Sequence, residues 1–234
     1  MAANDLILNP TLYLGWFEWR EPITTLTDLT VSLICIYAVV SFARHKGQKS
    51  KNFFYYQGYF LCFAIGMMSA AWLGHGLVAY VGTEWKVIGW IMSIIGYLFL
   101  GNASLIQIKP ITPKRNFDII RALFAVQIVM FLFLILNPFT RNFKIAQIGS
   151  IVSLIGFILP MHLYNYSKTK QNGSLLIISA IIFGLIPAIV YNTQFSFSHW
   201  FNYHDISHVL VAINMVIIFI GAKHLSTKTL IKTT

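Results

Sequence analysis

Charged side chains are scarce in this chain: Asp, Glu, Lys and Arg make up 10% of its 234 residues, whereas 57% are hydrophobic. Soluble domains carry about 25% charged residues, which cover the surface that faces water. The composition therefore excludes a water-soluble globular protein. With only seven acidic residues, the formal net charge is +10. The distribution of that charge, described below, points to membrane orientation rather than to nucleic-acid binding.

Cysteines and targeting signals are also few. The two cysteines, Cys35 and Cys62, fall inside apolar segments, where each is expected to pack as a small apolar side chain and to report no redox compartment. Met1–Asn9 lacks the basic region that opens a cleavable secretory signal, so the first apolar segment should stay in the mature protein. No Gly-rich phosphate loop, GxSxG or HExxH motif occurs. A retinal protein is also disfavoured, because no lysine lies in the middle of the last apolar segment to form the Schiff base.

Hydrophobic residues are grouped in blocks of about 20, the length of a helix that crosses roughly 30 Å of hydrocarbon. Barrel strands would be shorter and would alternate. The pattern predicts an all-α, polytopic membrane protein, a single domain over residues 1–234 with seven transmembrane helices. Their expected bounds are Pro22–Ala43, Phe53–Tyr80, Trp85–Ile108, Asp118–Leu136, Ile145–Tyr166, Ser174–Phe195 and His204–Lys223.

Basic residues are distributed unequally between the two ends of these segments. Thirteen belong to one side: Arg44, Lys46, Lys49, Lys51, Lys109, Lys114, Arg115, Arg121, Lys168, Lys170, Lys223, Lys228 and Lys232. The other side has four: Arg20, Lys86, Arg141 and Lys144. Because cytoplasmic loops are enriched in Lys and Arg, the C-terminus is expected in the cytoplasm and the N-terminus outside or in a lumen. We expect an integral multi-pass protein of the cytoplasmic (inner) membrane of a bacterium, with a membrane lipid and no nucleic acid as its partner.

Three of the seven histidines fall near the predicted non-cytoplasmic side, His75 at the end of the second segment and His204 and His208 at the start of the seventh. Ionisable groups in membrane helices are costly and usually functional. Residues i and i+4 project from one helix face, so His204 and His208 can reach one metal ion, with His75 as a third ligand at similar depth. The alternative is that these rings are hydrogen-bonded interfacial residues. Asp205 can orient one imidazole, although a favourable interaction with the helix dipole is the preferred interpretation.

The other histidines are not expected to join this group. His45, His162 and His224 belong to the predicted cytoplasmic side, and His199 lies in the aromatic loop Ser196–Tyr203, where solvent or lipid headgroups are its expected neighbours and ligation stays open. An interfacial aromatic belt is expected from Trp16, Trp19, Trp85, Trp200 and Tyr80.

Asp28 is the most unusual acid, because it falls about two turns into the first segment and seven residues after Glu21, on roughly the same face. Two interpretations are open. The threonines between them, Thr24, Thr25 and Thr27, can bond back to the helix backbone around a neutral Asp28. Alternatively, this polar face borders a hydrated cavity beside the metal.

Several of these features together resemble the alkaline ceramidase group, part of a superfamily of seven-helix membrane hydrolases that also includes the progestin and adipoQ receptors. They are a histidine at the end of helix two, HxxxH at the start of helix seven, and Glu21-Pro-Ile-Thr24-Thr25-Leu-Thr27-Asp28 matching Glu-x-x-[Asn/Thr]-Thr-x-[Ser/Thr]-[Asn/Asp]. The resemblance spans the helical domain through topology rather than close sequence identity. It implies a zinc ion, Zn²⁺, held by His75, His204 and His208.

Two catalytic positions depart from the superfamily pattern. Ala71 stands where a serine precedes the helix-two histidine by four residues, and Ser69 would lie about 120° away from that histidine on a regular helix. Lys86, with Glu84 nearby, stands where an aspartate opens helix three. A hydrolase would need a replacement acid or base, for which Asp28 is the first candidate and Ser69 the second.

The leading hypothesis is a zinc-dependent intramembrane hydrolase of a lipid amide, such as a ceramide-like N-acyl lipid, that uses a metal-activated water. The alternative is a non-enzymatic, receptor-like or structural seven-helix protein whose metal site links helices two and seven. A haem or electron-transfer site is disfavoured, because two imidazoles on one helix face are poorly placed to bind opposite sides of a macrocycle.

Overall fold

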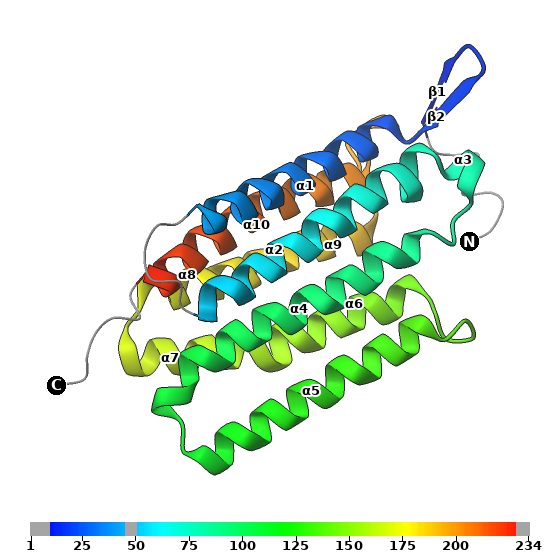
Figure 1. Cartoon of the computed structure of the whole chain (residues 1–234). Helices are drawn as coiled ribbons and strands as arrows, with labels where there is room; N and C mark the ends of the chain where they lie inside the picture. Colours follow the sequence, from blue (N-terminus) through cyan, green and yellow to red (C-terminus); the bar gives the residue numbers. More distant parts are fainter. Residues whose placement is uncertain (1–9, 45–50, 228–234) are drawn as a thin grey trace.

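The computed structural model describes residues 10–44 and 51–227, which form an elongated bundle of roughly parallel helices (Figure 1). In this part of the chain, seven helices are long and apolar enough to cross a membrane: Pro22–Ala43, Lys51–Gly76, Lys86–Ile111, Lys114–Leu136, Phe143–Thr169, Asn172–Thr193 and Tyr203–Ser226. The predicted seven helices are confirmed. Several sequence-based assignments lie outside the described residues, namely Met1–Asn9, His45, Lys46, Lys49, Lys228 and Lys232.

Three spans are interrupted or extended by helices of other types, and a fourth is divided into two α-helices. The first span is α1 (Pro22–Ala43), and the second consists of α2 (Lys51–Ser69) and the π-helix η2 (Ala70–Gly76), followed by the short helix α3 (Val78–Val81). The third and fourth are α4 (Lys86–Ile108), which continues into the 3₁₀-helix η3 (Lys109–Ile111), and α5 (Lys114–Leu136). The fifth joins α6 (Phe143–Ile151), the π-helix η4 (Val152–Ile158) and α7 (Leu159–Thr169). The sixth is α8 (Asn172–Phe183) and α9 (Leu185–Thr193), and the seventh is α10 (Tyr203–Thr227).

A β-hairpin that the sequence analysis did not predict precedes α1. Strands β1 (Thr11–Leu14) and β2 (Phe17–Arg20) pair antiparallel, with Leu14 opposite Phe17. Gly15 has a φ of 63°, which a glycine at the first central position of a tight hairpin turn adopts without steric cost. The second span also ends at Gly76 rather than at the predicted Tyr80, because the chain leaves the π-helix there and Tyr80 belongs to α3.

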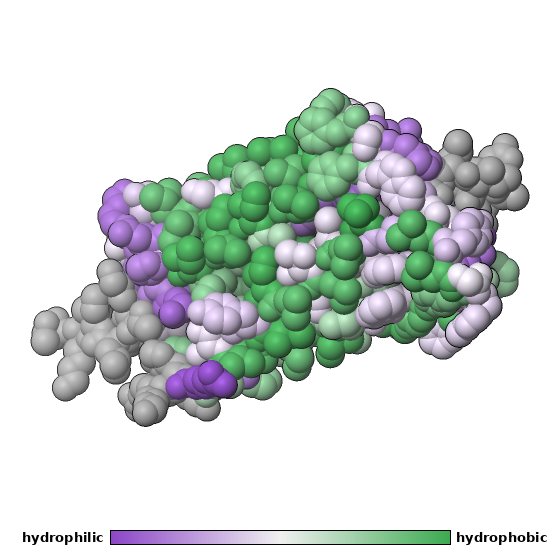
Figure 2. All heavy atoms as spheres, turned by 90° about the horizontal axis from the view of Figure 1, so that it is seen from above, coloured by the Kyte–Doolittle hydropathy of each residue, from purple (hydrophilic) through white to green (hydrophobic). Residues whose placement is uncertain are grey.

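The interior of the bundle is aromatic, and its outer surface is apolar. Tyr56, Tyr59 and Phe60 of α2 are almost fully buried where α2 packs between α1 and α4. The peripheral helix α5 leaves large side chains such as Val129 and Phe133 66% exposed. Figure 2 shows the apolar surface along the middle of the molecule and hydrophilic residues at both ends. Such an extended apolar surface is typical of a protein embedded in a membrane.

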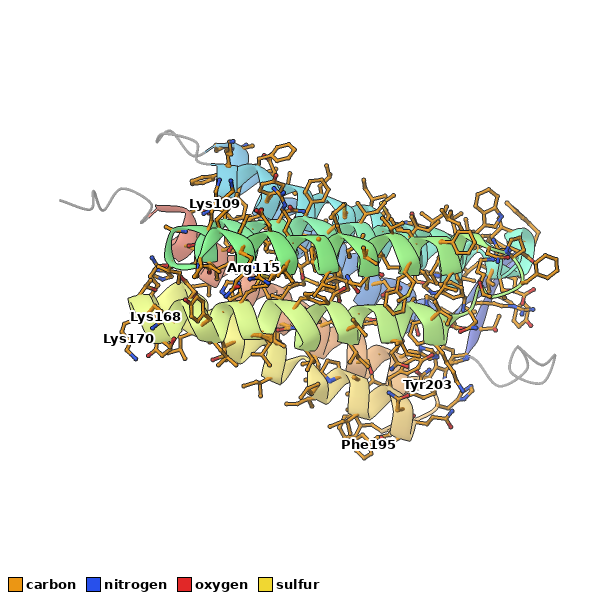
Figure 3. The ribbon with its side chains drawn as sticks, turned by 90° about the horizontal axis from the view of Figure 1, so that it is seen from below. Lys109, Arg115, Lys168, Lys170, Phe195 and Tyr203 are labelled. Carbon is orange, nitrogen blue, oxygen red and sulfur yellow. The ribbon has the colours of Figure 1, made fainter. Side chains whose placement is uncertain are left out.

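The two ends of the bundle differ in charge. Lys109, Arg115, Lys168 and Lys170 lie together at one end, which we call the basic end, and Phe195 and Tyr203 lie at the other (Figure 3). We call the latter the hairpin end, because it also carries β1, β2 and α3 (Figure 1). Cys35 and Cys62 are free, buried thiols inside the bundle, as predicted.

Candidate metal and lipid site

Three histidine rings meet at the hairpin end of the bundle. His75 comes from η2, and His204 and His208 come from the first two turns of α10. The ring centroid of His75 lies 5.8 Å from that of His204 and 6.1 Å from that of His208, and the two α10 rings are 6.4 Å apart. Two imidazoles bound to one zinc ion at about 2 Å hold their ring centres roughly 5–6 Å apart. The helices therefore bring the three predicted ligands close to the spacing of a shared ion.

The first turn of α10 is fixed by a capping arrangement. The Asn202 side chain accepts a hydrogen bond from the His204 amide at 2.9 Å, and the Asp205 carboxylate accepts one from the Asn202 amide at 2.7 Å. This reciprocal pattern satisfies two backbone donors that the helix leaves free. The other Asp205 oxygen accepts the Thr24 hydroxyl at 2.6 Å, which ties α10 to α1. Asp205 thus positions the segment that carries both histidines, rather than bonding to an imidazole in the described structure.

His75 lies in a π-helical turn, which changes the geometry assumed from the sequence. The Leu77 amide donates to the Trp72 carbonyl at 2.7 Å, five residues back instead of four. The regular α-helical spacing used to place Ala71 and Ser69 relative to His75 does not apply here. Ala71 is fully buried, and Ser69 is not among the residues that line the cavity described below.

Two carboxylates of α1 contact the histidines. Glu21 Oε2 accepts a hydrogen bond from His75 Nδ1, and Asp28 Oδ1 lies 2.9 Å from His208 Nδ1. The remaining oxygen, Asp28 Oδ2, lies 3.7 Å from His75 Nε2, so the Asp28 carboxylate sits between rings of helices two and seven. The Thr27 hydroxyl is 3.4 Å from His208 Nδ1. In both rings Nδ1 faces oxygen atoms of α1, an arrangement that commonly orients metal-binding histidines and leaves Nε2 for the ion.

Asp28 is fully buried, and within the described part of the chain neither of its carboxylate oxygens has a well-aligned hydrogen-bond partner, despite the 2.9 Å separation from His208. A buried carboxylate without hydrogen bonds is costly unless a positive charge balances it. Protonated imidazoles or a bound cation would supply that charge. The second of the two sequence interpretations, a polar face beside a cavity, fits Asp28, while Thr25 and Thr27 do bond back to backbone carbonyls at 3.0 Å.

Glu21 is the residue that sequence analysis undervalued. It immediately precedes α1, is 5% exposed, and has a φ of 46°, a left-handed conformation that costs a non-glycine residue about 1 kcal/mol or more. Burial alone raises the pKa of Glu21, but the hydrogen bond from His75 and electrostatic attraction to His75 and Lys86 outweigh it and lower the pKa to about 2. Glu21 is therefore an ionised carboxylate beside His75. The sequence signal was the seven-residue spacing from Asp28.

The imidazole nitrogens of the cluster are of the kind that binds zinc, although the side chains do not stand in a ready coordination geometry. Across residues 10–44 and 51–227, no group of three or more His, Cys, Asp or Glu side chains holds its donor atoms in position for a metal ion as they stand. Three observations favour His75, His204 and His208 as ligands: the spacing of the ring centroids, the oriented Nδ1 atoms, and a buried carboxylate between the rings that has no well-aligned hydrogen bond.

A cavity of about 770 Å³ adjoins the histidines. At the hairpin end Asp28, His75, His204 and His208 line it. Its other walls are largely apolar and come from α2, α4, η4 and α8, including Phe63, Tyr97, Leu154 and Ile181. Cavities of this size, with a few convergent polar groups at one end, are typical ligand sites.

Two aromatic rings line part of the cavity at the hairpin end, and the side of the cavity borders the apolar surface. The Phe143 ring of α6 lies 5.0 Å from Tyr191 of α9, whose ring is 5.4 Å from that of His204. Farther along the same helices, Ile151 and Leu185 line the cavity and are 46% and 42% exposed. The cavity is therefore open between α6 and α9 toward the surface that faces lipid.

Other histidines lie elsewhere in the fold. His199 is exposed beside Trp200 in the loop before α10, 6.2 Å between ring centroids. His162 is fully buried toward the basic end, with Nε2 3.0 Å from Ser104 Oγ and Nδ1 3.1 Å from Ser174 Oγ. This ring joins α4, α7 and α8 and takes no part in the three-histidine cluster. His224 lies in the last turn of α10, far from the cluster along that helix.

Comparison with known proteins gives a family but no function. No curated protein and no solved structure matches the chain. The model of a family of unknown function, DUF6962, matches residues 23–227, a stretch that contains α1 to α10 and all three clustered histidines. The chain belongs to this family of unknown function, DUF6962.

Proposed function

We propose that this protein is a zinc-dependent intramembrane hydrolase of a lipid amide, similar in design to the alkaline ceramidase group. The observation that carries the proposal is the meeting of His75, His204 and His208 with the buried Asp28 at the hairpin end of a cavity that also borders the lipid-facing surface. A long-chain substrate can enter such a cavity from the bilayer without crossing water.

Each polar residue has a distinct part in this proposal. His75, His204 and His208 hold the metal, and Glu21 keeps the His75 ring oriented through Nδ1. Zinc held by these residues would supply a Lewis acid for the acyl carbonyl and for the attacking water. Asp28 Oδ2 faces the centre of the cluster, where it accepts the proton of the attacking water and returns it to the amide nitrogen as the C–N bond breaks. The products are a fatty acid and an amine.

Asp28 is the stronger of the two catalytic candidates named from the sequence. It lines the cavity between two histidines, whereas Ser69 lies outside the lining residues of the described structure. Its buried position removes competing water contacts, which strengthens its interaction with nearby charge.

Membrane orientation is part of the proposal. The basic end is placed in the cytoplasm by the positive-inside rule, and the hairpin end with its cavity faces the opposite side. In a bacterial inner membrane, hydrolysis then takes place at the level of the outer leaflet.

The test uses purified protein, elemental analysis and an N-acyl lipid amide as substrate. We expect about one zinc per chain and measurable amide hydrolysis. His208→Ala should lose the zinc. Asp28→Asn should lower turnover by roughly 10²-fold or more even at saturating zinc, because it removes the proton acceptor, and it should also weaken zinc affinity, because it replaces the carboxylate beside His208 Nδ1. His199→Ala, an exposed histidine at the same end, is the matched control and should change neither. Wild-type protein without stoichiometric zinc would refute the proposal.

The second candidate is a non-enzymatic receptor-like or structural protein whose metal links helices two and seven. It is favoured by Ala71, a fully buried methyl side chain at the position of the superfamily serine, and by Lys86 in place of its aspartate. In that case chelation lowers the thermal stability of the protein and no lipid amide is hydrolysed. Turnover that disappears in His75→Ala would exclude this candidate.

A further inference from the structure

Two cations border the same cavity at the hairpin end. Lys86, the first residue of α4, and Arg141, in the loop between α5 and α6, are both among its lining residues. The Lys86 stem packs along the second span: a Cβ at Gly74, one residue before His75, would lie 3.4 Å from Lys86 Cγ. The ammonium group is thus anchored beside the histidine cluster, although Lys86 itself is only half-buried.

Neither cation is neutralised by an ion pair within the described residues. The nearest acid in sequence, Glu84, also borders the cavity, but it is exposed and its carboxylate folds back over Gly82. The Arg141 amide donates a hydrogen bond to the carbonyl of Asn137, the residue just after α5, at 2.9 Å. This bond holds Arg141 next to the end of that helix. Asn142 caps α6 next to it, which fixes this corner of the cavity mouth.

Away from these cations the wall of the cavity is apolar over a long distance. Along α4 the lining residues run from Lys86 through Trp90 to Tyr97, and these two ends are about 16 Å apart at 1.5 Å per residue. That length reaches from one membrane interface to about the middle of a roughly 30 Å hydrocarbon layer. A hydrocarbon chain fits this wall, and a headgroup placed at its mouth meets Lys86 and Arg141.

We propose that the cavity binds an anionic amphiphile, a long-chain lipid whose carboxylate or phosphate headgroup is held by Lys86 and Arg141. The inference rests on the proposed function for the reaction and narrows its substrate class to amide lipids with a negatively charged headgroup. Hydrogen bonds between a cation and an anion are about twice as strong as neutral ones.

The experiment measures equilibrium binding to chelator-treated protein in a neutral detergent, so that neither zinc nor turnover is needed. The first ligand pair is N-lauroylglycine and its methyl ester, which share the chain and the amide and differ in one negative charge. We expect the acid to bind about tenfold more tightly than the ester, as one charge-assisted contact implies. Monododecyl phosphate, against dodecanol, tests the second headgroup.

The variants distinguish binding of the anion at this site from its nonspecific attraction to a positively charged protein. Lys86→Gln and Arg141→Gln should each remove most of the preference for the acid over the ester. Lys144→Gln is the matched control: this exposed lysine lies at the same end, outside the cavity lining, and should leave the preference intact. The headgroup is identified by comparing N-lauroylglycine with monododecyl phosphate. It is that of the anion that binds more tightly and whose binding is weakened by Lys86→Gln and Arg141→Gln but not by Lys144→Gln.

Equal affinity of acid and ester for the wild-type protein overturns the inference. So does a loss of the preference for the acid in Lys144→Gln that equals the loss in Lys86→Gln and Arg141→Gln. These outcomes are independent of hydrolysis. A protein that binds no zinc but prefers the acid refutes the proposed function alone, and one that hydrolyses neutral amides without preferring the acid refutes this inference alone.

Discussion

Glu21 offers the sharpest test of the metal site, because it touches one proposed ligand and is not itself a ligand. Its buried carboxylate accepts the Nδ1 hydrogen bond of His75 and thereby directs Nε2 toward Asp28 and the cavity. Removing such an orienting partner typically weakens metal affinity by about 10- to 100-fold. We expect Glu21→Gln, which keeps an acceptor but loses the charge, to fall near the lower figure and Glu21→Ala near the upper.

The size of the effect follows from linkage between binding and folding. At a free zinc concentration 100 times the wild-type dissociation constant, zinc stabilises the folded protein by about 2.7 kcal/mol. At the same concentration, a tenfold weaker site gains about 1.4 kcal/mol and a hundredfold weaker site about 0.4 kcal/mol. The zinc-dependent part of the free energy of unfolding should therefore drop by about half in Glu21→Gln and almost vanish in Glu21→Ala.

The assay is a zinc titration against a chromophoric chelator, combined with unfolding of each variant with and without zinc. Glu18→Gln is the matched control: Glu18 pairs with Arg20 at 2.6 Å on the partly exposed hairpin, where such a pair contributes about 0–1 kcal/mol and does not contact the histidines. Zinc affinity of Glu21→Ala equal to that of the wild type, or equal losses in the Glu18 and Glu21 variants, would refute the assigned role of Glu21.

Two further predictions concern the bundle away from the site. Gly101→Ala should destabilise the protein by about 1–3 kcal/mol in a thermal unfolding measurement, because a Cβ at Gly101 overlaps the ring of Phe124 where α4 meets α5. Gly156→Ala, whose Cβ meets its nearest neighbour at 3.9 Å, is the control, and an equal loss there would contradict the packing argument. His162→Ala should cost about 0.6–1.7 kcal/mol, as it breaks bonds to serines on two other helices, while leaving zinc affinity unchanged. Altered zinc affinity in that variant would contradict the separation of His162 from the cluster.

The seven spans could be predicted from the sequence, because backbone polar groups in lipid must be satisfied within the segment and each helix therefore needs one long apolar run. The nearness of His75 to His204 and His208 followed from the same reasoning. With seven alternating spans, the end of helix two and the start of helix seven fall on one side of the bundle. The depth of the three histidines and the side of the bundle on which they lie could thus be predicted from residue numbers alone. The contacts between their side chains and α1 could not.

Other features of the site depend on interactions between residues far apart in the sequence. The Glu21 side chain reaches His75 over 54 residues, and Thr24 reaches Asp205 over 181. The pattern of apolar residues predicts neither the left-handed conformation of Glu21 nor the hairpin that precedes it. Rotation of α1 about its axis decides whether Asp28 faces lipid or histidine, and that rotation is set by tertiary packing.

The two π-helical segments of the described chain explain why a cavity exists in an otherwise well-packed bundle. Residues of η2 and of η4 line the cavity from the second and fifth spans. Single π-helical turns are frequent at functional sites, since they depart from the regular spacing that packs helices together. Pro160, the second residue of α7, lacks an amide hydrogen and accounts for the break in the fifth span just after η4. Glycines at positions 74 and 76 allow close approach around His75. The same departures from regular helix geometry therefore make room for a ligand beside the histidines.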